Sequence, residues 1–340
     1  MKVLVTGGGG FLGGAVVRQL LDDGDDVSIF NRSDYPDLAA LGVRVIRGDL
    51  GDAAAVAAAC AGTDAVIHVG ARAGPGLRRA DFERANVDGT RHVLDACRRH
   101  GVGLLVHTSS PSVVHAGRDL EGVDESLPYP HRHPAPYPAT KAAAERMVLA
   151  ANGDRLRTVA LRPHLVWGPG DNHLLPRLVE RNRAGRLRLP APEKRIDTTY
   201  IENAARAHVL ALRELAAQAR CAGRAYFISN GEPRPVGEIM QMLLLAAGDV
   251  PRIRRVSPAT ARIAAAVVDP LWRLLPLRRD PPVSRFLVEH LATAHWFDIG
   301  AAARDLGYRP EVSIDEGLQR LAAAWRSAPT ATKTAADVSS

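Results

Sequence analysis

The chain has 340 residues, of which 46% are hydrophobic and 24% are charged, so it can bury one large core or two modest ones. Its formal net charge of +7 comes mainly from arginines spread along the whole chain among acidic residues, which argues against a nucleic-acid footprint because such a footprint is clustered. The three cysteines, Cys60, Cys97 and Cys221, lie far apart, and no leader pattern or apolar run of roughly 18 residues occurs, so we expect a cytoplasmic protein without disulfides.

Strand and helix patterns alternate through the first half of the chain. This alternation predicts an α/β fold, with a Rossmann-type doubly wound parallel sheet covered by helices on both faces. The expected strands are residues 3–6, 27–30, 43–47, 65–69, 104–108 and 158–161. The expected helices are residues 11–21, 52–60, with Asp52 near the cap, 86–100 and 137–151.

The alternation ends at about Pro169, and the second half contains proline, arginine and short apolar pieces. Helices are expected at 174–184, 203–217, 236–247 and 314–325. We therefore predict a Rossmann domain over 1–168 and a smaller C-terminal substrate-binding lobe over 169–326, with some of its segments returning to the sheet. Residues 327–340 lack periodicity and are expected to form a disordered tail.

A glycine-rich turn, GGGGFLG at 7–13, follows the first expected strand and opens the first expected helix. Glycines allow a tight turn and a close approach of a pyrophosphate, whose charge is favourable at a helix N-terminus. Glycine runs alone are weak evidence, but a strand before and a helix after are the context of a dinucleotide site. The candidate cofactor-binding residues here are Gly7, Gly10, Phe11, Leu12 and Gly13.

The end of the second expected strand bears on the choice of cofactor. An acidic residue there would bind the ribose hydroxyl of NAD, whereas this chain has Asn31 followed by Arg32, whose guanidinium can pair with a 2′-phosphate. The pattern favours NADP(H). Asp49 and Leu50, after the third expected strand, are candidate adenine contacts.

Tyr137 and Lys141 lie four residues apart, which places them on one face of a helix that we expect to begin at the tyrosine. A nearby ammonium should lower the pKa of the phenol, which could then act as an acid or a base. Two surface residues are the alternative, weakened because the chain has only four lysines among 44 basic residues. The fifth expected strand ends at Ser109 and Ser110, and either hydroxyl could polarise a carbonyl.

These motifs together resemble the extended short-chain dehydrogenase/reductase family, which includes the NAD-dependent epimerases and dehydratases. The matching runs are TGGGGFLG at 6–13, NVDGT at 86–90, TSS at 108–110, LRPHLVWG at 161–168 and DLGYRP at 305–310. The resemblance implies Tyr137 as catalytic acid or base, Lys141 as a ligand of the nicotinamide ribose, and Ser110 as the polarising hydroxyl. It also implies that Asn86 supports the site.

Within this family the chain is similar to the 3β-hydroxysteroid dehydrogenase branch, through APYPATK at 135–141, VLAANG at 148–153 and DTTYIEN at 197–203. Three further runs, at 30–36, 108–114 and 226–233, resemble the reductases of bacterial long-chain olefin biosynthesis. The resemblance implies NADPH-dependent reduction of the 3-oxo group of a 2-alkyl-3-oxoalkanoic acid to its 3-hydroxy form.

Several alternatives stay open. A 3β-hydroxysteroid dehydrogenase-like enzyme, a nucleotide-sugar epimerase or dehydratase, and a non-catalytic NADP-sensing protein share much of the pattern. The apolar residues 259–275 could form a core helix, one wall of an acyl tunnel, or a patch for peripheral membrane contact. A homodimer is expected, and it could associate with other enzymes of the same pathway. His131 and His133 fit a loop better than a metal site, and no metal is expected.

Overall fold

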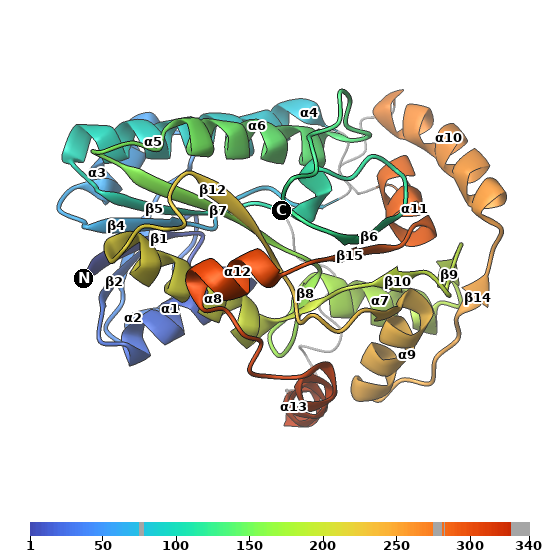
Figure 1. Cartoon of the computed structure of the whole chain (residues 1–340). Coiled ribbons are helices and arrows are strands. Elements are labelled where there is room, and N and C mark those ends of the chain that lie inside the picture. Colours follow the sequence, from blue (N-terminus) through green and yellow to red (C-terminus); the bar gives the residue numbers. More distant parts are fainter. Residues whose placement is uncertain (75–77, 275–280, 282, 328–340) are drawn as a thin grey trace.

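A computed structural model describes residues 1–74, 78–274, 281 and 283–327 (Figure 1). At its centre lies a seven-stranded sheet in the order β12-β7-β5-β4-β1-β2-β3, and every pair of neighbours is parallel. This order confirms the Rossmann-type doubly wound sheet. The strands are β1 (Lys2–Thr6), β2 (Asp26–Asn31), β3 (Arg44–Arg47), β4 (Ala65–His68), β5 (Leu104–Thr108), β7 (Arg157–Pro163) and β12 (Arg224–Ile228).

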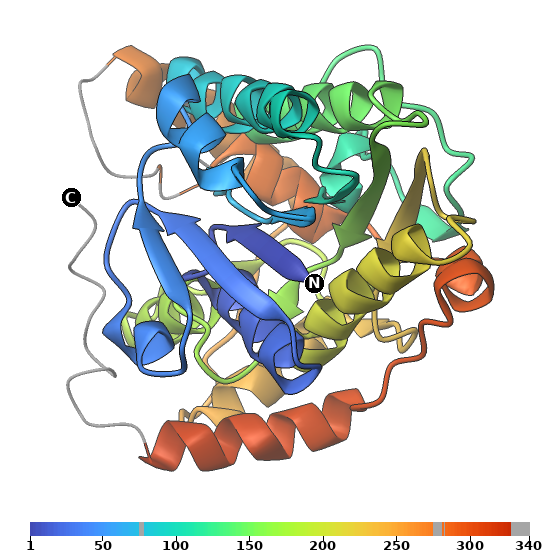
Figure 2. The ribbon, with the colours of Figure 1, turned by 90° about the vertical axis from the view of Figure 1, so that its left-hand side faces the viewer.

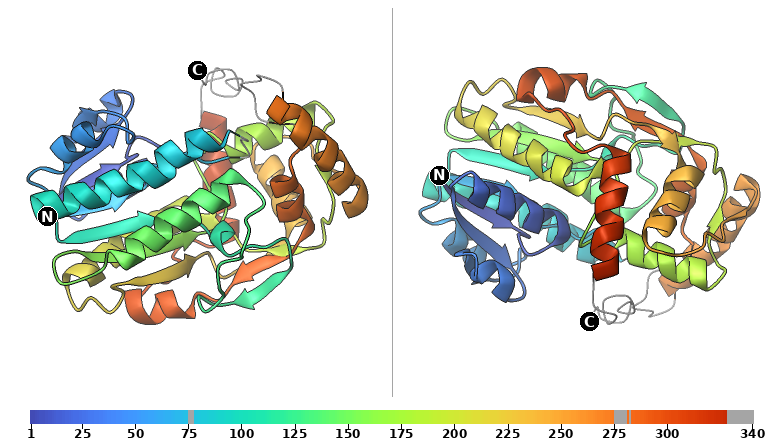
Figure 3. Two further views of the ribbon diagram at one scale, coloured as in Figure 1. Left: turned by 90° about the horizontal axis from the view of Figure 1, so that it is seen from above. Right: turned by 90° about the horizontal axis from the view of Figure 1, so that it is seen from below.

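Helices cover both faces of this sheet, as the views from above and below show (Figure 3). The central strands are rich in β-branched residues that are fully buried, such as Val3 and Val5, because they face apolar helices on either side. One face carries α3 (Ala53–Cys60), α5 (Gly89–His100) and α6 (Pro136–Ala150). The other carries α1 (Phe11–Asp22), α8 (Ile201–Ala216) and α12 (Gly300–Leu306).

Three local details differ from the sequence expectations. The helix expected from residue 86 begins instead as a π-helical turn, η1 (Glu83–Asp88), which continues into α5. Helix α6 begins at Pro136 rather than at Tyr137, because Pro136 fits a first-turn position that needs no N–H. Strand β12, which was not expected by position, adds a seventh strand. The cap at Asp52 is confirmed, since its carboxylate accepts from the N–H groups of Ala54 and Ala55.

The second half of the chain packs around a core of its own beside the sheet. A four-stranded sheet in the order β13-β10-β15-β6 lies there, together with two two-stranded pairs, β11-β8 and β14-β9. The helices are α7 (Leu174–Arg183), α9 (Val236–Ala246), α10 (Pro258–Leu274), α11 (Arg285–Ala292) and α13 (Ile314–Ser327). The short strands are β6 (Leu120–Val123), β8 (Val166–Trp167), β9 (Arg188–Leu189), β10 (Arg195–Ile196), β11 (Thr199–Tyr200), β13 (Arg234–Pro235), β14 (Arg254–Arg255) and β15 (His295–Phe297). Three further short elements lie in the first half of the chain: α2 (Pro36–Ala39), α4 (Arg79–Phe82) and the 3-10 turn η2 (Pro111–Val113).

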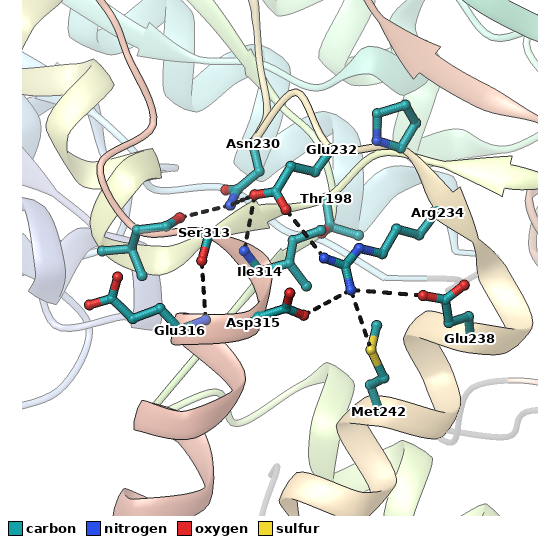
Figure 4. A network of polar contacts seen from close by, with 12 residues as sticks. Thr198, Asn230, Glu232, Arg234, Glu238, Met242, Ser313, Ile314, Asp315 and Glu316 are labelled. Carbon is teal, nitrogen blue, oxygen red and sulfur yellow. Dashed lines mark hydrogen bonds and ion pairs between the residues drawn. The ribbon is translucent and has the colours of Figure 1, made fainter.

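A polar network fixes α13 against the loop that follows β12 (Figure 4). The Glu232 carboxylate accepts from the N–H of Ile314, the first residue of α13, and from the side-chain amide of Asn230. Arg234 pairs with Asp315 at 2.9 Å. The helix also approaches closely, because a Cβ on Gly317 would lie 2.6 Å from the Tyr200 ring. Figure 2 shows α13 on the outside of the molecule.

The expected C-terminal tail is corrected at its first residue. Ser327 is the last residue of α13 and not part of a tail, while residues 328–340 lie outside the described residues. The division of the chain into domains at residue 168 stays a prediction. No helix among the described residues is long and apolar enough to span a membrane.

Candidate functional site

The glycine turn lies between β1 and β4, where the strand order reverses and doubly wound sheets bind ligands. Gly7 has a φ of +70°, and its carbonyl accepts from Gly10 N–H at 2.9 Å. A Cβ on Gly13 would lie 2.1 Å from the Gly7 carbonyl oxygen, and a Cβ on Gly7 would lie 2.7 Å from the Cα of Gly70. Side chains are excluded, which leaves a backbone cradle of the kind that a dinucleotide pyrophosphate requires.

The end of β2 supports this turn. The Asn31 side chain accepts from Gly9 N–H at 3.1 Å, and the Tyr35 ring occupies the space that a Cβ on Gly9 would need. Asn31 therefore has a structural role that its sequence position alone did not reveal. Arg32 follows it, exposed and without an ion pair to any described residue, so its guanidinium is available to a phosphate.

The other candidate cofactor-binding residues lie either at the edge of the sheet near the glycine turn or against the apolar core. Asp49 accepts from Gly51 N–H at 2.7 Å, and Leu50 packs beside Gly70 and Gly89 at the end of β3, on the same edge as the turn. Other candidates from the turn have partners within the protein: Phe11 and Leu12 are partly buried and pack against the core of the second half of the chain.

Tyr137 and Ser110 come together at the carboxyl end of β5. The Tyr137 ring contacts Phe82 and Phe286 edge-on, with centroid distances of 6.4 and 6.2 Å. Burial raises the pKa of Tyr137, and a hydrogen bond from Ser110 partly opposes this rise. The expectation that Lys141 lowers this pKa was wrong for the protein alone, because burial outweighs the other influences on the phenol.

Lys141 lies one helical turn further and is 3% exposed. Its ammonium donates to the carbonyl oxygen of Thr108 at 2.5 Å and lies 3.4 Å from Nε2 of His107. Burial lowers the pKa of Lys141 to about 8, and the Glu145 carboxylate partly opposes this change. The ammonium is thus held at the end of β5, beside the strand that carries the serines.

A buried ion pair lies behind the lysine. Glu145, one turn beyond Lys141 on α6, accepts from Arg162 on β7 through both carboxylate oxygens, at 2.7 and 3.0 Å. The hydroxyl of Tyr129 donates to the same carboxylate at 2.6 Å. Burial acts to raise the pKa of Glu145, but the guanidinium outweighs it and the pKa is lowered. The sequence interpretation missed this pair, although Glu145 lies at helical spacing from Lys141.

The π-helical turn positions Asn86 between two segments of the site. Its side-chain oxygen accepts from Arg72 N–H at 2.8 Å, and its amide donates to the Thr140 hydroxyl at 3.0 Å. Thr140 precedes Lys141, so Asn86 connects the segment after β4 to α6. This geometry fits the supporting role that the family resemblance implies, and π turns recur at functional sites.

Several apolar residues that the sequence suggested as ligand walls lie elsewhere. Within the segment 259–275, which the sequence offered as one wall of an acyl tunnel, Val267 and Leu271 of α10 are 55% and 50% exposed. Phe286 of α11, which the sequence did not single out, contacts Tyr137 instead. His131 and His133 lie in a loop, as expected. Within the described residues, one group of three histidines, His164, His290 and His295, has ligand atoms close together.

Comparisons with known proteins agree with this architecture. A model of the 3-beta hydroxysteroid dehydrogenase/isomerase family matches residues 4–256. The 2-alkyl-3-oxoalkanoate reductase of Stenotrophomonas maltophilia (strain K279a) is 55% identical over 95% of this chain and 99% of that protein. The protein of the same name from Shewanella oneidensis is 44% identical over 94% of this chain and 85% of that protein. A 3 beta-hydroxysteroid dehydrogenase/Delta 5-->4-isomerase of Mycobacterium tuberculosis is 36% identical, over 93% and 88%.

Solved structures with the same fold hold a dinucleotide. The UDP-glucose 4-epimerase of Thermus thermophilus, in complex with NAD, has a TM-score of 0.75 and 25% identity over 97% of this chain and 100% of that one. MoeE5 in complex with UDP-glucose and NAD has a TM-score of 0.74 and 25% identity over 96% and 99%. The matched residues and relatives confirm the resemblance seen in the sequence. The chain belongs to the 3-beta hydroxysteroid dehydrogenase/isomerase family.

Proposed function

We propose that this protein is an oxidoreductase that reduces the 3-oxo group of 2-alkyl-3-oxoalkanoic acids to the 3-hydroxy acids, with NADPH as the reductant. The observation that supports it most is the buried Lys141, which lies one helical turn beyond Tyr137 and is held at the end of the strand that leads to Ser110, in a chain 55% identical to a reductase of that name.

In this proposal each side chain has one task. The Ser110 hydroxyl polarises the carbonyl of the substrate, and Tyr137 supplies a proton to the oxygen as negative charge develops there. Lys141, held by Thr108, binds the nicotinamide ribose and stabilises the phenolate that remains. A bound dinucleotide supplies the hydride, and Gly7, Gly10 and Gly13 with their turn would hold its pyrophosphate.

The preference for NADPH rests on Arg32 and on the missing acid before it. Asn31 is occupied by the glycine turn, so it does not take the place of a carboxylate that binds the ribose hydroxyls. Arg32 is exposed beside that turn and has no partner among the residues described, so it can take a 2′-phosphate in a charge-assisted pair. Asp49 and Leu50 would lie against the adenine.

The environment of Tyr137 supports an apolar substrate. Two phenylalanines, Phe82 and Phe286, flank the phenol, and neither offers a hydrogen bond to a sugar hydroxyl. A sugar-nucleotide site must match many hydroxyls and a diphosphate, whereas an alkyl substrate needs apolar walls and one anchor for its carboxylate. The aromatic flanks therefore favour an acyl or sterol-like substrate over a nucleotide sugar.

One experiment tests the substrate class. NADPH oxidation is measured with 2-alkyl-3-oxoacids, 3-oxosteroids and UDP-sugars at equal concentration. The proposal expects turnover with the oxoacids; clear preference for a UDP-sugar would contradict it and favour an epimerase. Binding of NADPH with no turnover of any substrate would instead favour the sensor alternative.

A homologous series then tests how the substrate is bound. Racemic 2-alkyl-3-hydroxy acids of increasing chain length are oxidised with NADP⁺, since 3-oxoacids decarboxylate. Each buried methylene contributes ~0.8 kcal/mol, so kcat/KM should rise about fourfold per methylene until the chain is enclosed. A flat response would exclude an alkyl-binding site of this kind.

A steroid is the second candidate substrate, because the family model and the mycobacterial relative carry that name. Its rigid ring system needs a wide apolar pocket, which the aromatic flanks of Tyr137 would also suit. Turnover of a 3β-hydroxysteroid with NAD⁺, exceeding that of the hydroxy acids, would favour the steroid over the acyl substrate.

We further propose a cytoplasmic homodimer that can lie against a membrane or an enzyme of the same pathway. The outer side of α10 supports such a contact, because Ile263, Val267 and Leu271 recur at helical spacing and are 67%, 55% and 50% exposed. Sedimentation with and without vesicles of anionic lipid tests both parts. A protein that sediments as a monomer and does not bind the vesicles would contradict both the dimer and the membrane contact.

A further inference from the structure

Four histidines, three of them buried and one half-buried, meet where the end of β7 approaches α11 and β15. His164 directly follows β7, His290 lies on α11, and His295 begins β15. Their ring centroids lie 4.3 Å apart for His290 and His295, 4.8 Å for His164 and His295, and 5.9 Å for His164 and His290. The fourth ring, of His115, lies 5.3 Å from that of His290.

Neutral imidazole is the form that binds metal ions, and burial favours this form in all four rings. Burial lowers the pKa of His164 and that of His290 well below the usual value, and neighbouring histidines lower them further. His164 is 4% exposed and His295 2% exposed, whereas His290 is half-buried. The imidazoles are therefore packed together in surroundings that disfavour their charged form, although the Asp119 carboxylate acts in the opposite direction on His115 and His295.

Hydrogen bonds identify which nitrogens are free. Nε2 of His295 lies 2.7 Å from the carbonyl oxygen of His290, and because a carbonyl only accepts, this nitrogen carries the proton. Nδ1 of His295 then has a lone pair, and it has no hydrogen-bond partner among the described residues. Histidines that bind metals are commonly oriented by a carbonyl on the other ring nitrogen in this way.

His115 differs, because both of its nitrogens are satisfied. The Thr293 hydroxyl donates to the carbonyl of Glu289, so Nε2 of His115 must donate to that hydroxyl. Nδ1 of His115 then accepts from Gly117 N–H. No lone pair remains for a ligand, which separates His115 from the other three.

The other two rings have unpaired nitrogens that face this group. Both ring nitrogens of His164 and Nδ1 of His290 lack a hydrogen-bond partner among the described residues. An unpaired buried polar atom typically costs about 1–3 kcal/mol, so their accumulation at one place needs an explanation. One ligand atom from each of His164, His290 and His295 lies within 4.8 Å of the other two.

We propose that His164, His290 and His295 bind a divalent transition-metal ion of the zinc type. Zinc–nitrogen bonds of ~2.05 Å in a tetrahedron set the nitrogens ~3.4 Å apart, so ligand atoms that lie within 4.8 Å of one another need to close by up to about 1.4 Å. Neutral imidazole suits zinc and its neighbours among the transition metals, and not magnesium or calcium. Three protein ligands leave the fourth position for water or a carboxylate.

The position of the site gives the ion a structural task near the phenol. Phe286 lies one helical turn before His290 on α11, and its ring contacts both His290, at 5.4 Å, and Tyr137, at 6.2 Å. An ion held by His164 and His290 would fasten α11 to the end of β7. It would thereby position Phe286 beside the phenol, without touching the reacting atoms.

The test uses full-length protein prepared without a polyhistidine tag and stripped with a chelator. Titration with Co²⁺, followed by its visible ligand-field absorption, and with Zn²⁺, followed by calorimetry and metal analysis, measures stoichiometry and geometry. We expect one equivalent, the intense absorption of a four- or five-coordinate cobalt site, and a melting temperature that rises with Zn²⁺ concentration.

Variants identify the ligands. His164→Phe and His295→Phe retain a ring without nitrogen and should weaken binding by more than the ~10–100-fold that loss of an outer partner costs. His131→Phe, at an exposed histidine, should leave binding unchanged. The proposal would be overturned if the parent protein bound no stoichiometric metal or gave the weak spectrum of six-coordinate cobalt. It would also be overturned if the His164→Phe and His295→Phe variants bound the metal as tightly as the parent protein does. Because the first two readouts use the parent protein, the test stands even where a variant fails to fold.

Discussion

Two buried polar regions flank Tyr137, and they differ in charge. Arg162 and His164 lie two residues apart at the end of β7, both almost fully buried. The arginine donates two hydrogen bonds to the Glu145 carboxylate, whereas neither nitrogen of the histidine has a partner among the described residues. Burying a charge without a counter-charge costs far more than leaving a nitrogen of a neutral ring unpaired. Arg162 thus belongs to a buried ion pair, whereas His164, two residues away, belongs to a cluster of neutral rings.

The largest effect is expected at the phenol between the two regions. Tyr137→Phe removes the proton donor and keeps the ring packed on Phe82 and Phe286, so turnover should fall ~10²–10⁴-fold while NADPH binding stays nearly unchanged. Steady-state kinetics and fluorescence titration of NADPH measure the two. Turnover within tenfold of the parent would show that another group supplies the proton.

The charged region is broken by Glu145→Gln. The substitution keeps the shape of the side chain but leaves Arg162 as an uncompensated buried charge, which typically costs ~3–5 kcal/mol. Urea unfolding measures the loss. Glu316→Gln is the matched control, since its ion pair with Arg320 is exposed and its removal should cost at most about 1 kcal/mol. Equal losses in both variants would mean that burial does not strengthen the inner pair.

An exposed arginine sharpens the comparison with Arg162. Arg32→Ala should narrow the preference for NADPH over NADH by about ten- to a hundredfold, because a charge-assisted phosphate contact contributes ~1.5–3 kcal/mol. The folding stability should not change, since Arg32 lacks an ion pair with any described residue. Ratios of kcat/KM for the two cofactors measure the effect. A parent protein that uses both cofactors equally would remove the basis of this prediction.

The neutral region is tested by acid. The folded protein holds His164 and His290 neutral, and burial lowers the pKa of His115 to about 4, whereas the unfolded chain takes up protons near pH 6.5. Stability should therefore fall from pH 6.5 toward 5, by up to ~1.4 kcal/mol per pH unit for each such histidine. Burial also lowers the pKa values of His68, His107 and His208, which add to this fall. Asp197, whose pKa burial raises to about 6, opposes this fall, as do Glu125 and Glu289, whose pKa values burial also raises.

Urea midpoints measured at half-unit intervals of pH, without added metal, follow this loss. His115→Phe should reduce the slope by up to one proton if it folds. The Glu145–Arg162 pair does not contribute in this window, because a carboxyl whose pKa is lowered loses its stabilisation only further into acid. Stability that is constant or rises down to pH 5 would contradict the assignment of neutral histidines.

The sequence predicted best what depends on short spacing. The glycine turn at 7–13 follows from the need for a bare backbone, and Tyr137 with Lys141 follows from helical periodicity. Every expected strand was found within about two residues at each end. These features depend on neighbours along the chain, so a pattern of residues is enough to reveal them.

What the sequence did not predict depends on contacts between distant segments. His164 lies more than a hundred residues before His290 and His295, and no spacing rule connects them. Phe286 meets Tyr137 only because the fold brings α11 to the first turn of α6. The direction of the Tyr137 pKa was mispredicted for the same reason, since the burial that raises this pKa comes from the tertiary structure.

The polar network that fixes the first turn of α13 has a consequence for the local motion of this helix. Its first turn is held by Glu232 and Arg234 (Figure 4). Gly317 lets the helix lie directly on the Tyr200 ring. The last turn has only the partly buried Trp325 against the core. Local unfolding of α13 should therefore begin at its carboxyl end and proceed toward the first turn. Amide protons near residue 326 should exchange with deuterium far sooner than those near residue 318.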